Sequence, residues 1–334
     1  MALLSLLLIC IIIFASGMGY LEITFQDTVR IIFGNVFGGN SRMVGIDDVY
    51  QVVVMEVRLP RILTSAIVGG GLAVAGAVFQ SILLNPLADP YTLGVSAGAA
   101  FGASLALLFN VAFLGVYSTP AFAFLGAVTT LLLVIYLTST SGGISSNNLI
   151  LSGIIVSAIL SAGLSFLKYL ADEQVSVIIF WLMGSFVSKT WSDVILTFIF
   201  VCFGFLIIIY FSRDLNLLSL GDRAASSLGI HTKRVTMIML VTASMIAAVC
   251  VSVSGIIGFV GLIVPHMVRR FTGPDNRKLL PVSILVGAIL LLGADTVTRA
   301  LLPSEIPIGV LTALIGGPFF CYILKKRNMI VRGE

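Results

Sequence analysis

The sequence predicts an all-α polytopic membrane protein, and three observations lead to this fold class. Of the 334 residues, 58% are hydrophobic and only 10% are charged, whereas a soluble domain carries about 25% charged residues. The mean hydropathy is +1.13. Apolar runs of roughly 17 to 25 residues recur along the chain, and each is long enough as a helix to cross a hydrocarbon core of about 30 Å. We therefore expect a single transmembrane domain over residues 1–334.

Hydropathy predicts ten membrane-spanning helices. They are expected at about residues 2–19, 62–84, 92–109, 119–138, 148–170, 192–211, 234–252, 256–268, 279–298 and 306–324. The first run lacks the basic leader of a signal peptide and further spans follow it, so it is predicted to be a span itself. Run 256–268 is short and contains Gly and Pro, so its ends are the least defined. The apolar run 175–187 is too short to cross and is predicted to be a re-entrant or interfacial helix.

The distribution of Lys and Arg near the span ends predicts the orientation. Basic residues gather in three segments that are separated from one another by two spans: Arg213, Arg223, Lys233 and Arg234, then Arg269, Arg270, Arg277 and Lys278, then Lys325, Lys326, Arg327 and Arg332. We expect these segments and both termini to be cytoplasmic. Five spans separate the first segment from Arg61, and because this number is odd, Arg61 is expected on the outside of the membrane. This parity depends on run 175–187 not being a full span.

Composition and motifs disfavour several functions. The net charge of +4 is spread over loops, which suggests no nucleic-acid surface. Four cysteines occur singly inside apolar runs, without C-x-x-C spacing, and are predicted to be inert thiols: Cys10, Cys202, Cys250 and Cys321. No metal site is expected. No Walker-type phosphate loop is present, so a separate polypeptide must bind ATP if ATP drives the protein.

The predicted spans contain few ionisable residues. Asp295 is expected to pair with Arg299, four residues later on the same helix face, and His266 lies at a helix end. The absence of a chain of carboxylates argues against a proton- or sodium-driven carrier, and against an enzyme built on clustered His and Asp or Glu. Small residues suited to close helix packing crowd two spans: Gly69, Gly70, Gly71, Ala73, Gly76 and Ala77, and Gly94, Gly98 and Gly102.

The segment RLPR (58–61) precedes the second predicted span. Its two arginines suit a pair that anchors a helix end at the membrane surface. Pro60 suits the first turn of a helix, where its missing N–H is not needed. Spacing alone leaves open whether the arginines have a further role.

Four segments resemble one known family. They are RLPRILTSAIVGGGLAVAGAVFQSILLNPLADPYTLGVSAGAAFGA (58–103), LNLLSLGDRAASSLGI (215–230), GIIGFVGLIVPHMVRRFTGPDNRKLLP (255–281) and LGADTVTRALLPSEIPIGVLTALIGGPFF (292–320). They resemble the FecCD-type permeases of iron-siderophore, haem and vitamin B12 ABC importers, and they follow one another in the same order as in that family. Ile306 stands where the family commonly has Leu, and residues 20–57 are not recognisable.

The resemblance implies a ten-helix, vitamin B12 importer permease-like fold of the type II ABC importers. It implies a homodimer, or a pseudo-symmetric pair, in the inner membrane of a prokaryote. Two copies of an ATPase subunit would bind ATP and Mg, an extracytoplasmic substrate-binding protein would dock on the other side, and the permease itself would hold no cofactor and catalyse no reaction.

The resemblance also implies three groups of functional residues. Arg58, Arg61 and Arg299 match arginines that meet acidic residues of the binding protein in the B12 importer. Asn85 and Leu87 of the NPLADP turn, with Ser146 and Asn147, match the cytoplasmic gate. For the turn and for residues 146–147, ordinary turn chemistry remains an alternative.

The third group is the coupling loop at about residues 212–232. It is predicted to form two short helices, with Gly221 between them, Asp222 as a cap and Gly229 at the end of the second. Leucines on a basic loop have no membrane to enter, so they require a protein partner. The resemblance implies that the ATPase contacts Leu218, Leu220, Gly221, Asp222, Arg223, Ala224, Leu228 and Gly229.

The sequence therefore predicts a permease subunit that moves a metal chelate by alternating access. An iron-siderophore is the first candidate, and haem, cobalamin and molybdate remain open. The alternative is a secondary transporter or channel that acts without an ATPase; a membrane-embedded enzyme is the remaining option.

Overall fold

The computed structural model describes residues 1–332, apart from residues 20, 22, 38–45, 141–144 and 301–304, and describes only the backbone at 322–324 and 326–332. All regular elements of the described residues are helical, which confirms the predicted class. The α-helices are α1 Ala2–Gly17, α2 Phe25–Phe37, α3 Asp48–Val52, α4 Leu59–Ile82, α5 Val95–Leu108, α6 Ser118–Thr140, α7 Ser146–Leu170, α8 Val175–Leu182, α9 Trp191–Tyr210, α10 Ser212–Leu218, α11 Asp222–Ser227, α12 Thr232–Ser254, α13 Val260–Thr272, α14 Asn276–Ala300 and α15 Ile308–Arg332.

Helix length and hydropathy support most of the predicted spans. Six helical segments of the described chain are long and apolar enough to cross a membrane: Asp48–Ile82, Gly115–Thr140, Ser146–Leu170, Trp191–Tyr210, Thr232–Ser254 and Asn276–Ala300. Three shorter apolar segments match further predicted spans: Ala2–Gly17, Val95–Leu108 and Ile308–Cys321. Helix α13 corresponds to run 256–268 but begins only at Val260. The count of ten spans stays a prediction.

The run 175–187 forms the short helix α8. Its eight residues extend about 12 Å at 1.5 Å per residue, well below the thickness of a hydrocarbon core. Run 175–187 is therefore not a full span, and the parity argument keeps its premise.

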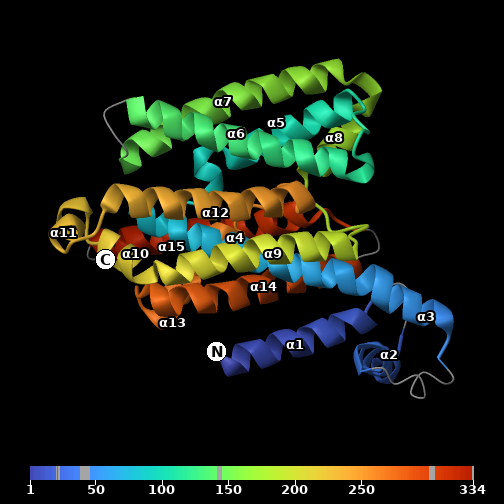
Figure 1. Cartoon of the computed structure of the whole chain (residues 1–334). Coiled ribbons are helices and arrows are strands. Elements are labelled where there is room, and N and C mark those ends of the chain that lie inside the picture. The colour runs from blue at the N-terminus through green and yellow to red at the C-terminus, as the bar shows by residue number, and fades with distance from the viewer. Residues whose placement is uncertain (20, 22, 38–45, 141–144, 301–304, 333–334) are drawn as a thin grey trace.

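Helix α4 occupies the centre of the molecule. In the most apolar 18-residue stretch of Asp48–Ile82, the segment that contains α4, 89% of the residues are buried, whereas in that of α7 only 17% are. Helices α9, α12, α13 and α14 pack around α4, and Figure 1 shows α5, α6 and α7 as a separate layer beside them. The outward face of α7 exposes large apolar side chains, including Ile159 and Phe166, as expected for contact with lipid or another subunit.

Glycines allow α4 and α5 to approach their neighbours closely. A Cβ atom at Gly76 would overlap the carbonyl oxygen of Gly261 at the start of α13, and one at Gly98 would overlap that of Gly126 on α6. These contacts confirm the close helix packing expected from the small residues, because only glycine leaves room for the facing backbone.

The segment RLPR lies inside a continuous helix rather than at its start. A π-helix at Val53–Arg58 joins α3 to α4, and the N–H of Leu59 donates to the carbonyl of Val54. Pro60 lies in the first turn of α4, as predicted, where the hydrogen-bond pattern changes from π to α. The helix nevertheless does not start there, because the π-helix continues it upstream of a residue that cannot donate.

The bundle has two chemically different ends. We call the end that contains Arg58, Arg61 and Arg299 the arginine end. The opposite end carries α10 and α11, and we call it the α10–α11 end. In Figure 1, α2 and α3 lie at the arginine end, whereas the N-terminal end of α1 and the C-terminal end of α15 point toward the α10–α11 end.

Candidate sites at the two ends of the bundle

At the arginine end, Arg61 is held between two carboxylates. Its Nε and Nη2 atoms donate to Asp295 Oδ1 at 3.1 and 2.9 Å, and its Nη1 donates to Glu305 Oε2 at 3.0 Å. The side chains of Arg61 and Asp295 are only 10% and 1% exposed, whereas that of Glu305 is 46% exposed. The bidentate contact with Asp295 therefore joins α4 to α14 inside the protein, and Glu305 covers the pair from outside.

Arg58 and Arg299 bind the C-terminal end of α1. Arg58 Nη1 donates to the carbonyl oxygens of Ser16 and Gly17, each at 2.9 Å, and its Nη2 donates to that of Leu21. Arg299 donates to two more carbonyls in the same turn, those of Ala15 and Met18. The last carbonyls of a helix have no partner within the helix and carry its negative dipole end, so two guanidinium groups satisfy them well.

These contacts change two expectations. The predicted pairing of Asp295 with Arg299 is wrong. Asp295 pairs with Arg61, and Arg299 donates to the C-terminal end of α1 instead. The docking role of Arg58, Arg61 and Arg299 stays a prediction. All three guanidinium groups have internal partners, and Arg61 also lines a cavity of about 210 Å³ together with Asp295 and Glu305.

At the α10–α11 end, the two short helices form as predicted. Gly221 has a φ of 96° between them, and Gly229 has a φ of 86° after α11, which are conformations that favour glycine. The predicted cap is wrong, because Gly221 is the N-cap and Asp222 is the first residue of α11. There its carboxylate faces the positive end of the helix dipole.

The coupling residues divide into an anchored group and an exposed group. Leu218 is buried, as is Leu215 beside it, so the apolar face of α10 packs on the protein itself. Leu220 and Leu228 are 64% and 60% exposed. The remaining predicted residues are intermediate or exposed: Gly221, Asp222, Arg223, Ala224 and Gly229. The expectation that the leucines need a partner therefore applies to two of the three.

The residues predicted to form the gate come together at the same end. Ser146 Oγ donates to the carbonyl of Ile82 at 3.3 Å, which joins the start of α7 to the end of α4. Asn85 Oδ1 accepts from the N–H of Leu87 at 3.0 Å, a local turn contact. Leu87 and Asn147 are exposed. Both segments therefore adjoin the end of α4, and their role in gating stays a prediction.

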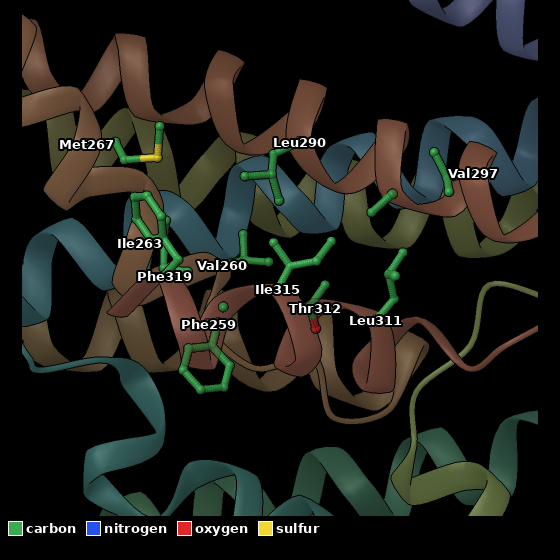
Figure 2. A pocket seen from close by; sticks show the side chains of 12 residues that line it. Phe259, Val260, Ile263, Met267, Leu290, Val297, Leu311, Thr312, Ile315 and Phe319 are labelled. Carbon is green, nitrogen blue, oxygen red and sulfur yellow. The ribbon is translucent and has the colours of Figure 1, made fainter. Parts of the chain in front are cut away.

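An apolar cavity lies between α13, α14 and α15. Its volume is about 340 Å³, and its lining comes from the start of α13, from α14 and from α15. Figure 2 shows Met267, Leu290 and Val297 along one side and Leu311 and Ile315 along the other. Thr312 supplies the polar group of this lining. Among the described residues, no group of three His, Cys, Asp or Glu side chains is placed to hold a metal ion.

Sequence reasoning missed two sets of residues. Glu305 was not singled out. Its position could have indicated a role, because it lies ten residues after Asp295, just beyond the span end where the three arginines were expected. Asn216, Asp275 and Asn276 were also missed, although Asn216 lies in the coupling loop and the other two precede a predicted span, where helix caps are common.

Comparison with known proteins identifies the family. The FecCD transport family matches residues 6–326. The cobalamin import system permease protein BtuC of Halobacterium salinarum is 43% identical over 286 residues, 85% of this chain and 76% of that protein. The molybdate import system permease protein MolB of Haemophilus influenzae is 39% identical over 332 residues, 98% of this chain and 96% of that protein.

A solved structure shares the fold. It is described as the inward-facing conformation of a metal-chelate type ABC transporter, and it matches with a TM-score of 0.84 and 37% identity over 97% of both chains. The chain therefore belongs to the FecCD transport family and is a permease subunit of the ABC importer type.

Proposed function

We propose that this permease imports a metal chelate by alternating access, driven by a separate ATPase and supplied by an extracytoplasmic binding protein. Two copies of the chain would enclose the path, and two ATPase subunits would bind ATP and Mg. The α10–α11 end would face the cytoplasm together with both termini, and the chain would cross the inner membrane ten times. The basic residues of this end support that orientation.

The observation that carries the proposal is the pair of exposed leucines on the α10–α11 end. Leu220 and Leu228 flank α11 and are more than half exposed, while Arg223 on α11 is exposed between them. Burying one leucine side chain against a partner is worth about 1.5–3 kcal/mol. Two such residues with an arginine beside them suit a partner groove that is apolar at its centre and acidic at its rim.

The gate would lie where α4 ends and α7 begins. Ser146 already joins these helices through the carbonyl of Ile82, and the turn at residues 85–90 lies directly beyond. A displacement of α4 relative to α7 would open or close this point. The gate residues would thus be Asn85, Leu87, Ser146 and Asn147, acting through the relative position of two helices.

The arginine end would receive the binding protein. Within the cluster formed by Arg58, Arg61, Arg299, Asp295 and Glu305, three cations meet two anions, and the remaining positive charge would attract acidic residues. Arg61 is the best placed of the three, because it lines a cavity and one of its partners, Glu305, is half exposed. Arg58 and Arg299 would support the surface by holding α1.

The cargo is proposed by class only. One related structure is described as a metal-chelate type transporter, and relatives of similar identity are permeases for cobalamin and molybdate. An iron-siderophore complex is the first ligand to test, with haem, cobalamin and molybdate in the same panel. The binding protein would select among them.

The test uses the permease with its ATPase in lipid nanodiscs. The double variant Leu220→Glu and Leu228→Glu should lower ATPase affinity by at least about 10-fold, since each change removes apolar burial and adds a charge. The matched control is Val116→Glu, which changes an exposed apolar residue next to α6 at the other end of the molecule. Unchanged ATPase binding in the double variant would contradict the proposal.

The rival function, a carrier or channel that acts alone, predicts uptake without nucleotide. Proteoliposomes that contain the permease, with and without the ATPase, separate the two. Uptake of an iron-siderophore complex that requires the ATPase and ATP supports the importer. Uptake of equal rate without the ATPase supports the rival.

A further inference from the structure

A chain of hydrogen bonds joins the anchored helix α10 to the last turn of α4. Asn216 Nδ2 donates to Asp275 Oδ1 at 2.7 Å, and the N–H of Asn276 donates to Asn216 Oδ1 at 2.8 Å. Ser81 Oγ then donates to Asn276 Oδ1 at 3.3 Å. We call Asn216, Asp275, Asn276 and Ser81 the α10–α4 bridge. It crosses from α10 through the start of α14 to α4.

The bridge is built into the protein. Asn276 and Ser81 are only 2% and 7% exposed, so their hydrogen bonds are protected from competition with water. Both polar ends of the Asn216 side chain are used. Hydrogen bonds from Asn216 and from Arg277 also lower the pKa of Asp275 to about 2, so this carboxylate is ionised at neutral pH and its bond to Asn216 is charge-assisted.

The bridge supplies what apolar packing on α10 does not. Leu215 and Leu218 bury α10 against the core, but apolar contact is non-directional and allows one helix to slide over another. A side chain that both donates and accepts fixes the position of α10 relative to α14 and α4.

The far end of the bridge lies next to the proposed gate. Ser81 immediately precedes Ile82, whose carbonyl accepts from Ser146 at the start of α7. The neighbouring carbonyl of Gln80 accepts from the N–H of Asn85. A displacement of α10 that is carried by the bridge therefore acts on the turn of α4 that holds both gate segments.

We infer that the α10–α4 bridge is the mechanical link between the ATPase-binding helices and the gate, with Asn216 as its positioning residue. This inference rests on the proposed function. It assigns to Asn216, Asp275, Asn276 and Ser81 a role in transmission that is separate from ATPase binding, which the exposed leucines provide.

The experiment measures gate movement without any cargo. A parent chain with Cys10, Cys202, Cys250 and Cys321 replaced by Ala receives one reporter cysteine, at Leu87 or at Asn147, both exposed. It is reconstituted with the ATPase in nanodiscs, and maleimide labelling is timed without nucleotide and with ATP plus vanadate. In the parent, nucleotide should change the labelling rate.

Two variants at Asn216 break the bridge. Asn216→Ala removes both hydrogen bonds, and Asn216→Asp places two carboxylates against each other. Each should keep ATPase binding and hydrolysis, while the effect of nucleotide on labelling falls at least about 5-fold, the lower end of typical coupling between sites. The matched control is Asn35→Ala, which removes a side-chain hydrogen bond on α2, an element that does not belong to the bridge.

A double variant separates transmission from folding. Asn216→Asp with Asp275→Asn restores one amide–carboxylate hydrogen bond with its direction reversed, and so should recover part of the nucleotide effect. Full effect in Asn216→Ala, or no recovery in the double variant, overturns the inference alone. Loss of ATPase binding in both also overturns it, because Asn216 would then only maintain the fold of α10. If the parent shows no nucleotide effect, the proposed function fails and the inference falls with it.

Discussion

The two ends of the bundle place the same types of side chain in opposite settings. At the arginine end, Arg61 is nearly buried and bonded to two carboxylates. At the α10–α11 end, Arg223 is exposed on a short helix between two exposed leucines. The first arrangement is complete within one chain, whereas the second leaves apolar and charged groups in contact with solvent.

This contrast indicates which end contributes to stability and which to association. A buried cation costs several kcal/mol unless partners compensate it, so Arg61 and Asp295 depend on each other. An exposed arginine has little effect on folding, and its charge remains available to a partner. The arginine end therefore has to remain intact for the fold, and substitutions there test stability before they test docking.

The largest expected effect follows from removing Arg61. In Arg61→Met, Asp295 would keep a buried charge without its cation, and breaking such a pair costs roughly 3–5 kcal/mol of unfolding free energy. Thermal unfolding in detergent measures the loss. The double variant Arg61→Met with Asp295→Leu should regain most of it, because well-packed apolar residues replace a buried pair at little cost.

A single Arg61→Met variant as stable as the unmodified protein would break the comparison. It would mean that water reaches the pair and that the arginine end is no more integral to the fold than the other end. The control is Arg30→Met, which removes an arginine that is 56% exposed and whose contact with Asp27 is 3.9 Å long.

A smaller effect is expected for Glu305→Gln. The carboxylate is 46% exposed, so its loss should change the unfolding free energy by less than about 1 kcal/mol. The neutral amide binds Arg61 less strongly than the carboxylate does. If Arg61 is the group that receives the binding protein, association should become a few-fold tighter, as measured by biolayer interferometry on nanodiscs.

Weaker or unchanged association in Glu305→Gln would argue against docking through Arg61. Glu173→Gln supplies the comparison, because Glu173 is an exposed carboxylate in the short segment between α7 and α8. Its substitution should leave both stability and association as they were.

The smallest effect on folding is expected for Arg223→Ala. An exposed side chain on α11 should change the unfolding free energy by no more than about 0.5 kcal/mol, while ATPase association at low ionic strength slows because a steering charge is lost. Stopped-flow association at two salt concentrations measures this. A destabilisation as large as that of Arg61→Met would erase the distinction between the two ends.

The sequence predicted the helical elements well because local signals specify them. Runs of apolar residues placed α1, α4, α5, α6, α7, α9, α12 and α14 within about three residues at each end, and glycines marked both ends of α11. The short helix α8 also followed from the length of its apolar run. These features depend on residues near one another in the chain, and one sequence contains that information.

Side-chain partners were predicted less well because they depend on distant segments. Asp295 was matched with Arg299 on its own helix, yet its partner Arg61 is 234 residues away. The cap at Asp222 was assigned from residue type, whereas the positive φ of Gly221 decided it. A rule of local spacing carries no information about which helices come into contact.

The sequence by itself determined the membrane-protein class, the order of the helices, and the presence of a leucine-containing loop on a basic segment. Only the tertiary structure decided that Arg58 and Arg299 hold α1, that Arg61 joins α4 to α14, and that Asn216 connects α10 to α4. The reason is physical. Hydropathy and turn chemistry act over a few residues, but a buried charge or amide must be satisfied by whatever group the folded chain brings within hydrogen-bond distance.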